Sequence, residues 1–382
     1  MNEQNGRGPL SLGNFIKRYP LSLLCGVFMT AFLAAYLIKP DTGFSELENR
    51  VLTGRPTLTG AGLWDGSFME SFELYTGEQL PLRDSFIRLK AFAERLLLKK
   101  ENNGIVRGKD GQLFEKALQY PDTLKRNEEI LSSFIRGLDR PAYLGIIPNS
   151  FEIQSDRLPA GLPRVNEKEE TDAFYDTISR ESDCVTIPFY DTLKQHENED
   201  IYYRTDHHWT TLGAYYGYET ICNTMDLEPV SLSSLKASQT GDFYGTYYAK
   251  YKGIGIRPDV ITWYEMPVSS YVNLDTGETH DGLYDESRLT VYDKYALFLY
   301  GNPGLAEIRG EESPAADERT LIIFKDSYAN CLIPFLTKHF DRILVVDLRY
   351  FGGSVQSLLA EEKPAELLFL YNFMHFSEDS HY

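Results

Sequence analysis

An unbroken apolar run from Pro20 to Ile38 is the strongest hydrophobic pattern in the chain. Its nineteen uncharged residues would span roughly the 30 Å hydrocarbon core of a bilayer as a helix of about 1.5 Å per residue. Arg7, Lys17 and Arg18 precede the run. The positive-inside rule therefore predicts a cytoplasmic N-terminus over residues 1–19, a transmembrane anchor over 20–38 and an extracytoplasmic remainder at the cell membrane. A cleaved secretory signal is the alternative, although its apolar region is usually shorter and no small-residue cleavage site ends this run.

Residues 39–106 read as a linker and a helical region. Apolar residues recur at helical spacing from Phe68 to Lys100, and Pro81 is expected to divide this stretch into two helices. The spacing predicts a stalk with a buried apolar face that carries Leu89, Phe92, Leu96 and Leu97. The turn residues Gly-Lys-Asp-Gly at 108–111 then mark the start of the main domain, placed at residue 107.

From residue 107 to 382, short apolar runs alternate with stretches of helix length. The runs that indicate strands are 142–147, 185–187, 320–324, 343–346 and 366–370. They are continuous rather than alternating, which is typical of strands covered on both faces. The pattern predicts an α/β domain with a mainly parallel sheet flanked by helices, and ligand chemistry beyond the carboxyl ends of the strands. Asp347 and Arg349 follow one such strand and are interpreted as a structural ion pair.

An aromatic-rich insertion is expected at about 230–319. Tyrosine and tryptophan recur through it, among them Tyr247, Trp263, Tyr271 and Tyr284. Flat rings with a polar edge suit stacking on sugars, and they equally suit the packing of an irregular segment. The sequence leaves both interpretations open.

Composition and charge exclude some classes of partner. The chain has 382 residues, 42% of them hydrophobic, and 38 Lys and Arg against 56 Asp and Glu, for a net charge of −18. Such a balance repels phosphate, and no basic stripe offsets it, so nucleic acid is not expected as a partner. Three of the four cysteines lie beyond the apolar run without metal-type spacing, so neither a disulfide framework nor a cysteine metal site is predicted.

Asp206-His207-His208-Trp209 is the stretch with the most evident chemistry. A carboxylate beside an imidazole can fix the tautomer of the ring and stabilise its charged form, as a general base requires. Two residues apart in an extended loop, Asp206 and His208 project to the same side, which favours His208 over His207 as the base. A metal site is the competing interpretation, because two imidazoles and a carboxylate are ligand-like, but no convincing further ligand is found.

The matching nucleophile is Ser327, which follows the predicted strand 320–324 at Lys325-Asp326-Ser327. A strand-to-helix turn can expose a serine hydroxyl above a sheet edge. Serine also favours such turns as a helix cap. The coincidence with Asp206 and His208 favours catalysis.

These residues carry a resemblance to a known family. Asp-His-His-Trp resembles the motif for which the DHHW protein family is named, a family similar to the SGNH-like polysaccharide O-acetyltransferases of the alginate type. In that pattern an Asp-x-His-Trp element precedes the serine, matched here by Asp206, His208, Trp209 and Ser327. Further stretches agree, namely Glu48-Asn49-Arg50, Leu82-Arg83-Asp84, residues 108–111 and 242–246, Gly301-Asn302, and Asp347-Leu348-Arg349.

The resemblance implies acyl transfer by a serine triad on an SGNH-like fold. Ser327 would form the acyl-enzyme, His208 would accept its proton, and Asp206 would hold His208, with no cofactor and no metal. The Ser327 amide, Gly301 and Asn302 are candidates to bind the oxyanion, with a plain turn as the alternative for the last two. Trp209 either packs the loop or forms a wall of the sugar site. Lys325 stands where the wider pattern has glycine, and it either crowds the oxyanion site or attracts an anion.

The implied activity is O-acetylation or deacetylation of a cell-surface polysaccharide. For a transferase, the family pattern suggests that a multispanning membrane O-acyltransferase supplies the acetyl group. The alternative function is a non-catalytic carbohydrate-binding or assembly protein that keeps the fold.

Overall fold

The computed structural model describes residues 18–45, 50–97, 99–253, 255–310 and 319–381. The chain divides into two compact units, Met1–Lys90 and Ala91–Tyr382. Most of the predicted cytoplasmic segment, together with Glu48 and Asn49, lies outside the described residues.

The N-terminal unit contains the long apolar helix α2 (Pro20–Ile38), which is long and apolar enough to cross a membrane. Its helices and strands after α2 are β1 (Phe44–Ser45), β2 (Arg50–Val51), α3 (Gly60–Asp65), α4 (Ser67–Glu78) and the start of α5 (Arg83–Leu96). The end of α4 holds the linker, because Glu78 accepts a hydrogen bond from Thr53 N at 2.5 Å and Gln79 exchanges two with Thr42 at 2.9 and 3.0 Å. Pro81 lies between α4 and α5, where the sequence places the break.

The face of α5 that the sequence predicts to be buried is exposed, so this prediction is wrong. Leu89 is 61% exposed, and Phe92, Leu96 and Leu97 are 42, 69 and 81% exposed. The spacing of apolar residues identifies the amphipathic helix but not what covers its apolar side. Within the part of the chain that the structure describes, no protein element covers it.

The second unit is built on a mixed sheet that is eight-stranded over the described residues. The order is β11-β10-β12-β14-β13-β15-β6-β7. The five strands from β14 to β7 are mutually parallel, and β12, β10 and β11 extend the sheet in antiparallel fashion. The predicted α/β class with a mostly parallel sheet is confirmed. The strand bounds are β6 (Ala142–Ile147), β7 (Val185–Thr186), β10 (Val268–Asn273), β11 (Glu278–His280), β12 (Leu305–Gly310), β13 (Thr320–Lys325), β14 (Arg342–Val346) and β15 (Glu366–Asn372).

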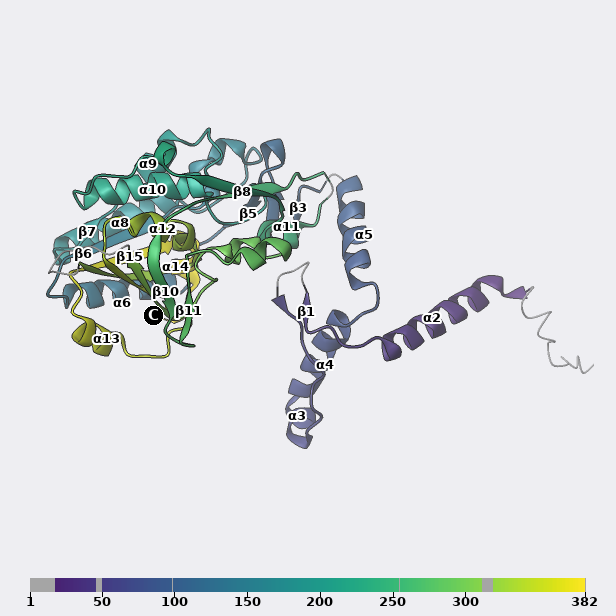
Figure 1. The fold of residues 1–382 in the computed structure, drawn as a ribbon. Helices are drawn as coiled ribbons and strands as arrows, with labels where there is room; N and C mark the ends of the chain where they lie inside the picture. The colour runs from purple at the N-terminus through teal and green to yellow at the C-terminus, as the bar shows by residue number, and fades with distance from the viewer. Residues whose placement is uncertain (1–17, 46–49, 98, 254, 311–318, 382) are drawn as a thin grey trace, which may run out of the picture. The chain divides into compact units, whose positions relative to one another are not determined.

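Helices cover both faces of this sheet (Figure 1). Alternate side chains of β13 enter two separate cores, Leu321 and Ile323 on one face and Ile322 and Phe324 on the other. This explains why the strand reads as a continuous apolar run. The first face is covered by α9 (Phe189–Gln195), α10 (Thr211–Thr224) and α12 (Ile333–Leu336), and the second by α6 (Leu124–Arg136), α8 (Glu167–Glu181), α13 (Val355–Glu362) and α14 (Phe373–Glu378).

Smaller elements complete the unit. The short helix α7 (Ser150–Ile153) follows β6, and a three-stranded sheet combines β3 (Glu101–Asn102), β4 (Ile105–Arg107) and β5 (Leu113–Glu115). The aromatic-rich stretch forms the hairpin of β8 (Ala237–Phe243) and β9 (Asp259–Tyr264), helix α11 (Thr246–Tyr251) and the antiparallel strands of the main sheet. Tyr247, Trp263 and Tyr271 in it are buried, which favours packing over sugar stacking for these rings.

Candidate active site at the carboxyl edge of the sheet

Ser327 lies at the carboxyl edge of the sheet. It begins a 3₁₀ turn, η6 (Ser327–Cys331), directly after the fully buried strand β13. Asp326 fixes this turn, because its Oδ1 accepts a hydrogen bond from Tyr328 N at 2.9 Å and its Oδ2 accepts one from Asn372 N, at the end of β15, at 2.7 Å. The serine is therefore held by two neighbouring strands of the sheet.

The loop 206–209 comes from the other side of the site, just before α10. Trp209 fastens it, since its indole N–H donates to the carbonyl of Tyr328 at 2.8 Å. Gly217 on α10 leaves room for the ring, because a Cβ there would lie 2.8 Å from the indole. Trp209 has no exposed surface. It packs the loop and cannot be a wall of a sugar site.

Asp206, His208 and Ser327 form one chain of hydrogen bonds. His208 Nε2 lies 2.8 Å from Ser327 Oγ, and His208 Nδ1 lies 2.6 Å from Asp206 Oδ1. All three residues are buried, with Ser327 the most exposed at 7%. The carboxylate fixes the Nδ1–H tautomer, which leaves Nε2 free to accept the serine proton. The structure thus brings together the three residues that the sequence selects across 121 positions.

Asp206 is held as an anion by four donors. Its Oδ1 accepts from His208 N and Nδ1, and its Oδ2 accepts from Thr246 N at 2.7 Å and Thr246 Oγ1 at 3.1 Å. Burial alone would raise the pKa of Asp206, but the neighbouring imidazoles of His207 and His208 and these hydrogen bonds hold it well below its ordinary value. Gly245 permits this approach, because a Cβ there would lie 2.2 Å from the carboxylate.

Tyr295, a residue that the sequence did not select, packs against His208. The Tyr295 ring stacks on the imidazole with centroids 3.7 Å apart and planes at 11°. Its hydroxyl donates to the carbonyl of Ser327 at 3.1 Å. Tyr295 therefore restricts both members of the base–nucleophile pair. In the sequence it is one of 26 tyrosines, and no spacing distinguishes it.

His207 occupies a different environment from His208. Its Nδ1 lies 2.6 Å from Thr246 Oγ1, and its carbonyl accepts a hydrogen bond from Tyr328 Oη. Burial, together with the neighbouring His208, lowers the pKa of His207 well below its ordinary value, which favours the neutral ring. Asp206, His207 and His208 lie close enough to share a metal ion. However, the hydrogen bonds already direct both nitrogens of His208 to Asp206 and Ser327, which favours the triad over the metal interpretation.

Gly301 and Asn302 lie in a strained turn. Leu299, Tyr300 and Gly301 all have left-handed backbone angles, with φ of 54, 58 and 93°. Such a conformation in two consecutive residues other than glycine costs free energy and is most often found at functional sites. Asn330 in η6 stabilises the turn, because its amide donates to Gly301 O at 3.1 Å and to Asn302 Oδ1 at 3.0 Å.

Lys325 neither faces solvent nor offers a free charge. Its side chain is fully buried, and Nζ donates to Asn302 Oδ1 at 2.9 Å and to Asp347 Oδ2 at 3.2 Å. Burial lowers the pKa of Lys325, and the charge of Asp347 opposes this shift. Asp347 also forms the ion pair with Arg349 at 2.7 Å that the sequence predicts. Full burial and the ion pair with Asp347 argue against the predicted attraction of an external anion, and the contact with Asn302 holds that side-chain amide in place.

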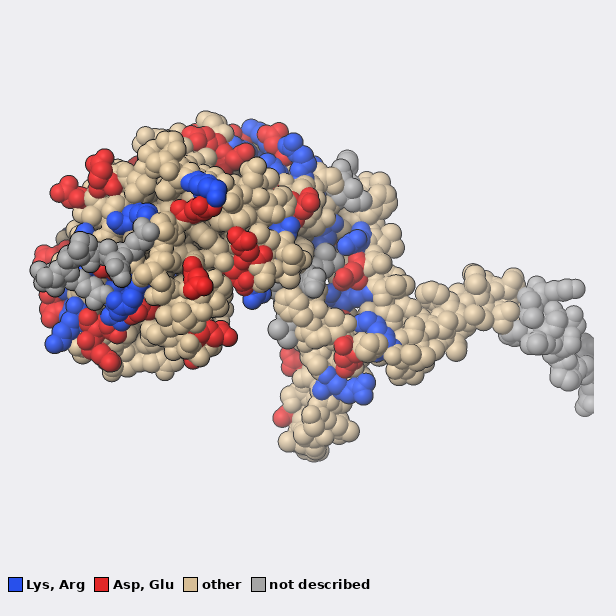
Figure 2. All heavy atoms as spheres, in the orientation of Figure 1, with Lys and Arg blue, Asp and Glu red and all other residues tan. Residues whose placement is uncertain are grey.

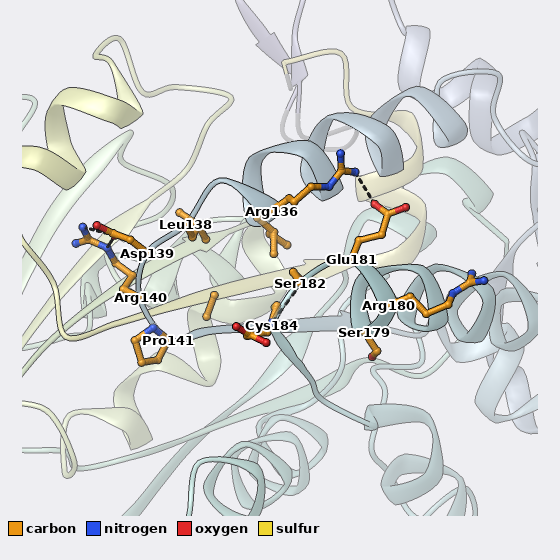
Figure 3. A pocket seen from close by; sticks show the side chains of 13 residues that line it. Arg136, Leu138, Asp139, Arg140, Pro141, Ser179, Arg180, Glu181, Ser182 and Cys184 are labelled. Carbon is orange, nitrogen blue, oxygen red and sulfur yellow. Dashed lines mark hydrogen bonds and ion pairs between the residues drawn. The ribbon is translucent and has the colours of Figure 1, made fainter.

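A hollow lies at the opposite end of the sheet, where β6 and β7 begin (Figure 3). Its volume is about 790 Å³, and it lies between the carboxyl ends of α6 and α8. Arg136 pairs there with Glu181, and Arg140 pairs with Asp139 at 2.9 Å, all at the surface. None of the triad residues lines it.

The comparisons with known proteins agree with this fold. The family model described as DHHW protein matches residues 132–346, more than half of the chain, including the loop 206–209 and Ser327. The chain belongs to the DHHW protein family. No curated protein matches it.

Solved structures with the same fold include a DHHW family protein from Eubacterium siraeum DSM 15702, with a TM-score of 0.61 and 23% identity over 74% of this chain and 94% of that one. Bacillus cereus PatB1, solved with a sulfonyl adduct, aligns with a TM-score of 0.59 and 20% identity over 72% of this chain and 96% of its own. The O-acetyltransferase domain of Pseudomonas putida AlgJ aligns with a TM-score of 0.45 and 12% identity over 72% of this chain and 94% of that one. At these identities the likeness shows the fold alone.

Proposed function

We propose that this DHHW family member is an extracytoplasmic acyl-transfer enzyme, anchored by α2, that adds acetyl groups to or removes them from hydroxyls of a cell-surface polysaccharide. The observation that carries the proposal is the pair of buried hydrogen bonds, of 2.6 and 2.8 Å, that link Asp206 to His208 and His208 to Ser327. A serine with a tautomer-fixed imidazole at this distance is an activated nucleophile.

In the proposed mechanism Ser327 Oγ attacks the carbonyl carbon of an acetyl ester or thioester, and its proton passes to His208 Nε2. His208 then gives the proton to the leaving group as the acyl-enzyme ester forms. In the second half, a sugar hydroxyl or water attacks this ester, loses its proton to His208, and Ser327 regains its hydroxyl. Asp206, kept ionised by its four donors, stabilises the charged imidazolium in both halves.

The oxyanion would be bound by the Asn302 side-chain amide together with the backbone N–H groups of Ser327 and Gly301. Lys325 and Asn330 both donate to Asn302 Oδ1. Because the oxygen of this amide is occupied, its NH₂ group is directed away from them and serves as the donor. A positioned donor of this kind is worth about 10²–10³ in kcat in serine hydrolases. In this proposal Lys325 takes the place of a glycine to orient Asn302.

The proposal also includes the source of the acetyl group. An acetyl group activated in the cytoplasm has to cross the membrane before it reaches an extracytoplasmic Ser327, so a multispanning O-acyltransferase is the expected supplier. The polysaccharide acceptor follows from the resemblance of Asp206, His208, Trp209 and Ser327 to the motifs of polysaccharide O-acetyltransferases. The SGNH-like character of the domain is part of the same proposal.

The test is to trap the acyl-enzyme. Incubating the protein with p-nitrophenyl acetate should add one acetyl group by intact mass, and peptide mapping should place it on Ser327. Ser327→Ala should remove both the adduct and the ester turnover, whereas Ser132→Ala, another buried serine on α6, should keep both. A sulfonyl fluoride should likewise modify Ser327, as the adduct on PatB1 suggests.

Two results separate the remaining alternatives. If a labelled acetyl donor passes its label to the polysaccharide, and less free acetate forms than without polysaccharide, the enzyme is a transferase. If the label appears only as free acetate, the enzyme is an esterase. An acetyl adduct that persists in Ser327→Ala would overturn the serine mechanism. A wild-type protein that binds glycan without forming any adduct would establish the non-catalytic alternative.

A further inference from the structure

Helix α5 carries an exposed apolar stripe. Leu82, just before the helix, and then Phe86, Leu89, Phe92 and Leu96 follow one another at spacings of three or four residues, which places them on one side. All of them are exposed, from 42% for Phe92 to 69% for Leu96. On the opposite side of the helix Ala91 is buried at 6% exposure, whereas the Asp84 side chain is 54% exposed. The side of α5 away from the stripe is therefore more polar and partly open to water.

Basic residues border the stripe on both sides. Each residue advances a helix by about 100°, so Arg83 and Lys90 lie along one border and Arg88 along the other. A large apolar face flanked by Lys and Arg is the composition of a helix that lies in the headgroup region of a bilayer. The same cations are attracted to anionic lipid headgroups.

The apolar helix α2 lies next to the start of the stripe. The rings of Phe86 and Phe32, the latter on α2, lie 6.2 Å apart in an edge-on arrangement. No residue of α2 is buried, and on the face shown in Figure 2 it displays no charged side chain. If α2 is in a membrane, a stripe that begins beside it is already next to lipid.

We propose that the apolar stripe of α5 lies in the lipid interface on the extracytoplasmic side of the membrane that α2 crosses. It thereby gives the protein a second membrane contact. The inference rests on the anchoring proposed above and is independent of acyl transfer. It also accounts for the wrong prediction of a protein-covered face, because the pattern is amphipathic and its apolar partner is lipid.

Site-directed spin labels test this in the full chain, reconstituted in vesicles of zwitterionic phosphatidylcholine and anionic phosphatidylglycerol. Cys25→Ser removes the exposed native thiol, and the other three cysteines are buried. Single cysteines are then placed in the stripe (L89C, L96C), on the opposite side of α5 (D84C) and in α2 (M29C). Collision rates with apolar oxygen and with a water-soluble nickel chelate report the surroundings of each label.

The expected result is that labels at 89 and 96 collide with oxygen severalfold more than with the chelate, that the label at 84 shows the reverse, and that the label at 29 is the most lipid-exposed. Water exposure at 89 and 96, or protection from both reagents as in a protein contact with a second copy, would overturn the proposal. Failure at 29 as well would overturn the anchor, whereas failure at 89 and 96 alone would overturn only the stripe.

A second pair of variants tests whether the stripe itself holds the label at 96 in lipid. Leu89→Glu should expose a label at 96 to the chelate, whereas the matched control Leu274→Glu, an exposed leucine of the second unit, should leave it protected. Both variants should still form the acyl-enzyme on Ser327, so a failed acyl-transfer proposal would be visible separately.

Discussion

The two ends of the central sheet differ in how deeply their polar side chains are buried. At the carboxyl edge, Asp206, His208 and Ser327 are nearly inaccessible, and Asp206 alone accepts four hydrogen bonds. At the amino edge, the Arg136–Glu181 ion pair in the hollow between α6 and α8 joins side chains that are 53 and 42% exposed. Exposed pairs of this kind contribute little free energy, whereas buried and fully satisfied networks fix geometry.

A hollow by itself does not identify a reaction centre. Catalysis needs groups whose positions and protonation states are set in advance, and of these two edges the carboxyl edge has such a set in Asp206, His208 and Ser327. This gives a matched control for every prediction below, because Arg136→Ala in the amino-edge hollow should leave both acyl transfer and its pH dependence unchanged. A fall in acyl-transfer kcat in Arg136→Ala would break the comparison at once.

The largest effect is expected for Asp206→Asn. An amide cannot accept hydrogen bonds on both sides, so its NH₂ group would face either Thr246 or His208 Nδ1. In the second case the proton of His208 moves to Nε2, which can then no longer accept from Ser327. We expect kcat for acetyl-ester turnover to fall by about 10³–10⁴. An unchanged melting temperature with full activity would show that the carboxylate does not set the tautomer.

Lys325→Met should have the next largest effect on the rate. It removes the Nζ donor to Asn302 Oδ1 and leaves that amide held by Asn330 alone. We expect kcat to fall by about 10–10² with little change in KM, because the oxyanion donor acts in the transition state. In an Asn302→Ala background the same substitution should cost no further kcat. Independent, additive losses would contradict a role of Lys325 through Asn302.

Gly245→Ala tests the packing behind Asp206. The added Cβ would lie 2.2 Å from the carboxylate, so the carboxylate or the loop has to shift. Overpacking of this kind costs about 1–3 kcal/mol of unfolding free energy, measurable by urea denaturation, and we expect a loss of activity with it. Gly241→Ala is the matched control, since nothing lies within 4 Å of its Cβ position. Equal stability of the two variants would contradict the close approach.

The sequence predicted those parts of the site that depend on local pattern. The continuous apolar run of β13 and the turn after it located Ser327. The choice of His208 over His207 rested on the alternation of an extended loop, but the chain bends at 204–208 and His208 N donates to Asp206 Oδ1, so His208 faces Asp206 for a different reason. The sequence could not predict the roles of Tyr295, Asn330 or Lys325, because these arise from contacts between segments far apart in the chain. The face of α5 was predicted as buried for a related reason, since periodicity identifies an apolar side but not its partner.

The smallest effect should come from His375→Gln, beside the reaction centre. His375 Nδ1 lies 3.4 Å from Asp326 Oδ2. Burial opposes the charge on this ring, but Asp326 has the stronger effect and raises the pKa of His375. His375 in turn helps to lower the pKa of the buried Asp326.

A raised histidine pKa stabilises the fold fully below its unfolded value of about 6.5, and the contribution is lost as pH rises through the folded pKa. The lowered aspartate pKa stabilises the fold only above about pH 4. Because the His375 side chain is 32% exposed, we expect His375→Gln to cost roughly 0.5–1 kcal/mol near pH 5.5 and almost nothing near pH 9 in urea titrations. His381→Gln, at a 56% exposed histidine, is the control, and a cost for His375→Gln that is equal at both pH values would mean that the ring is held by packing rather than by charge.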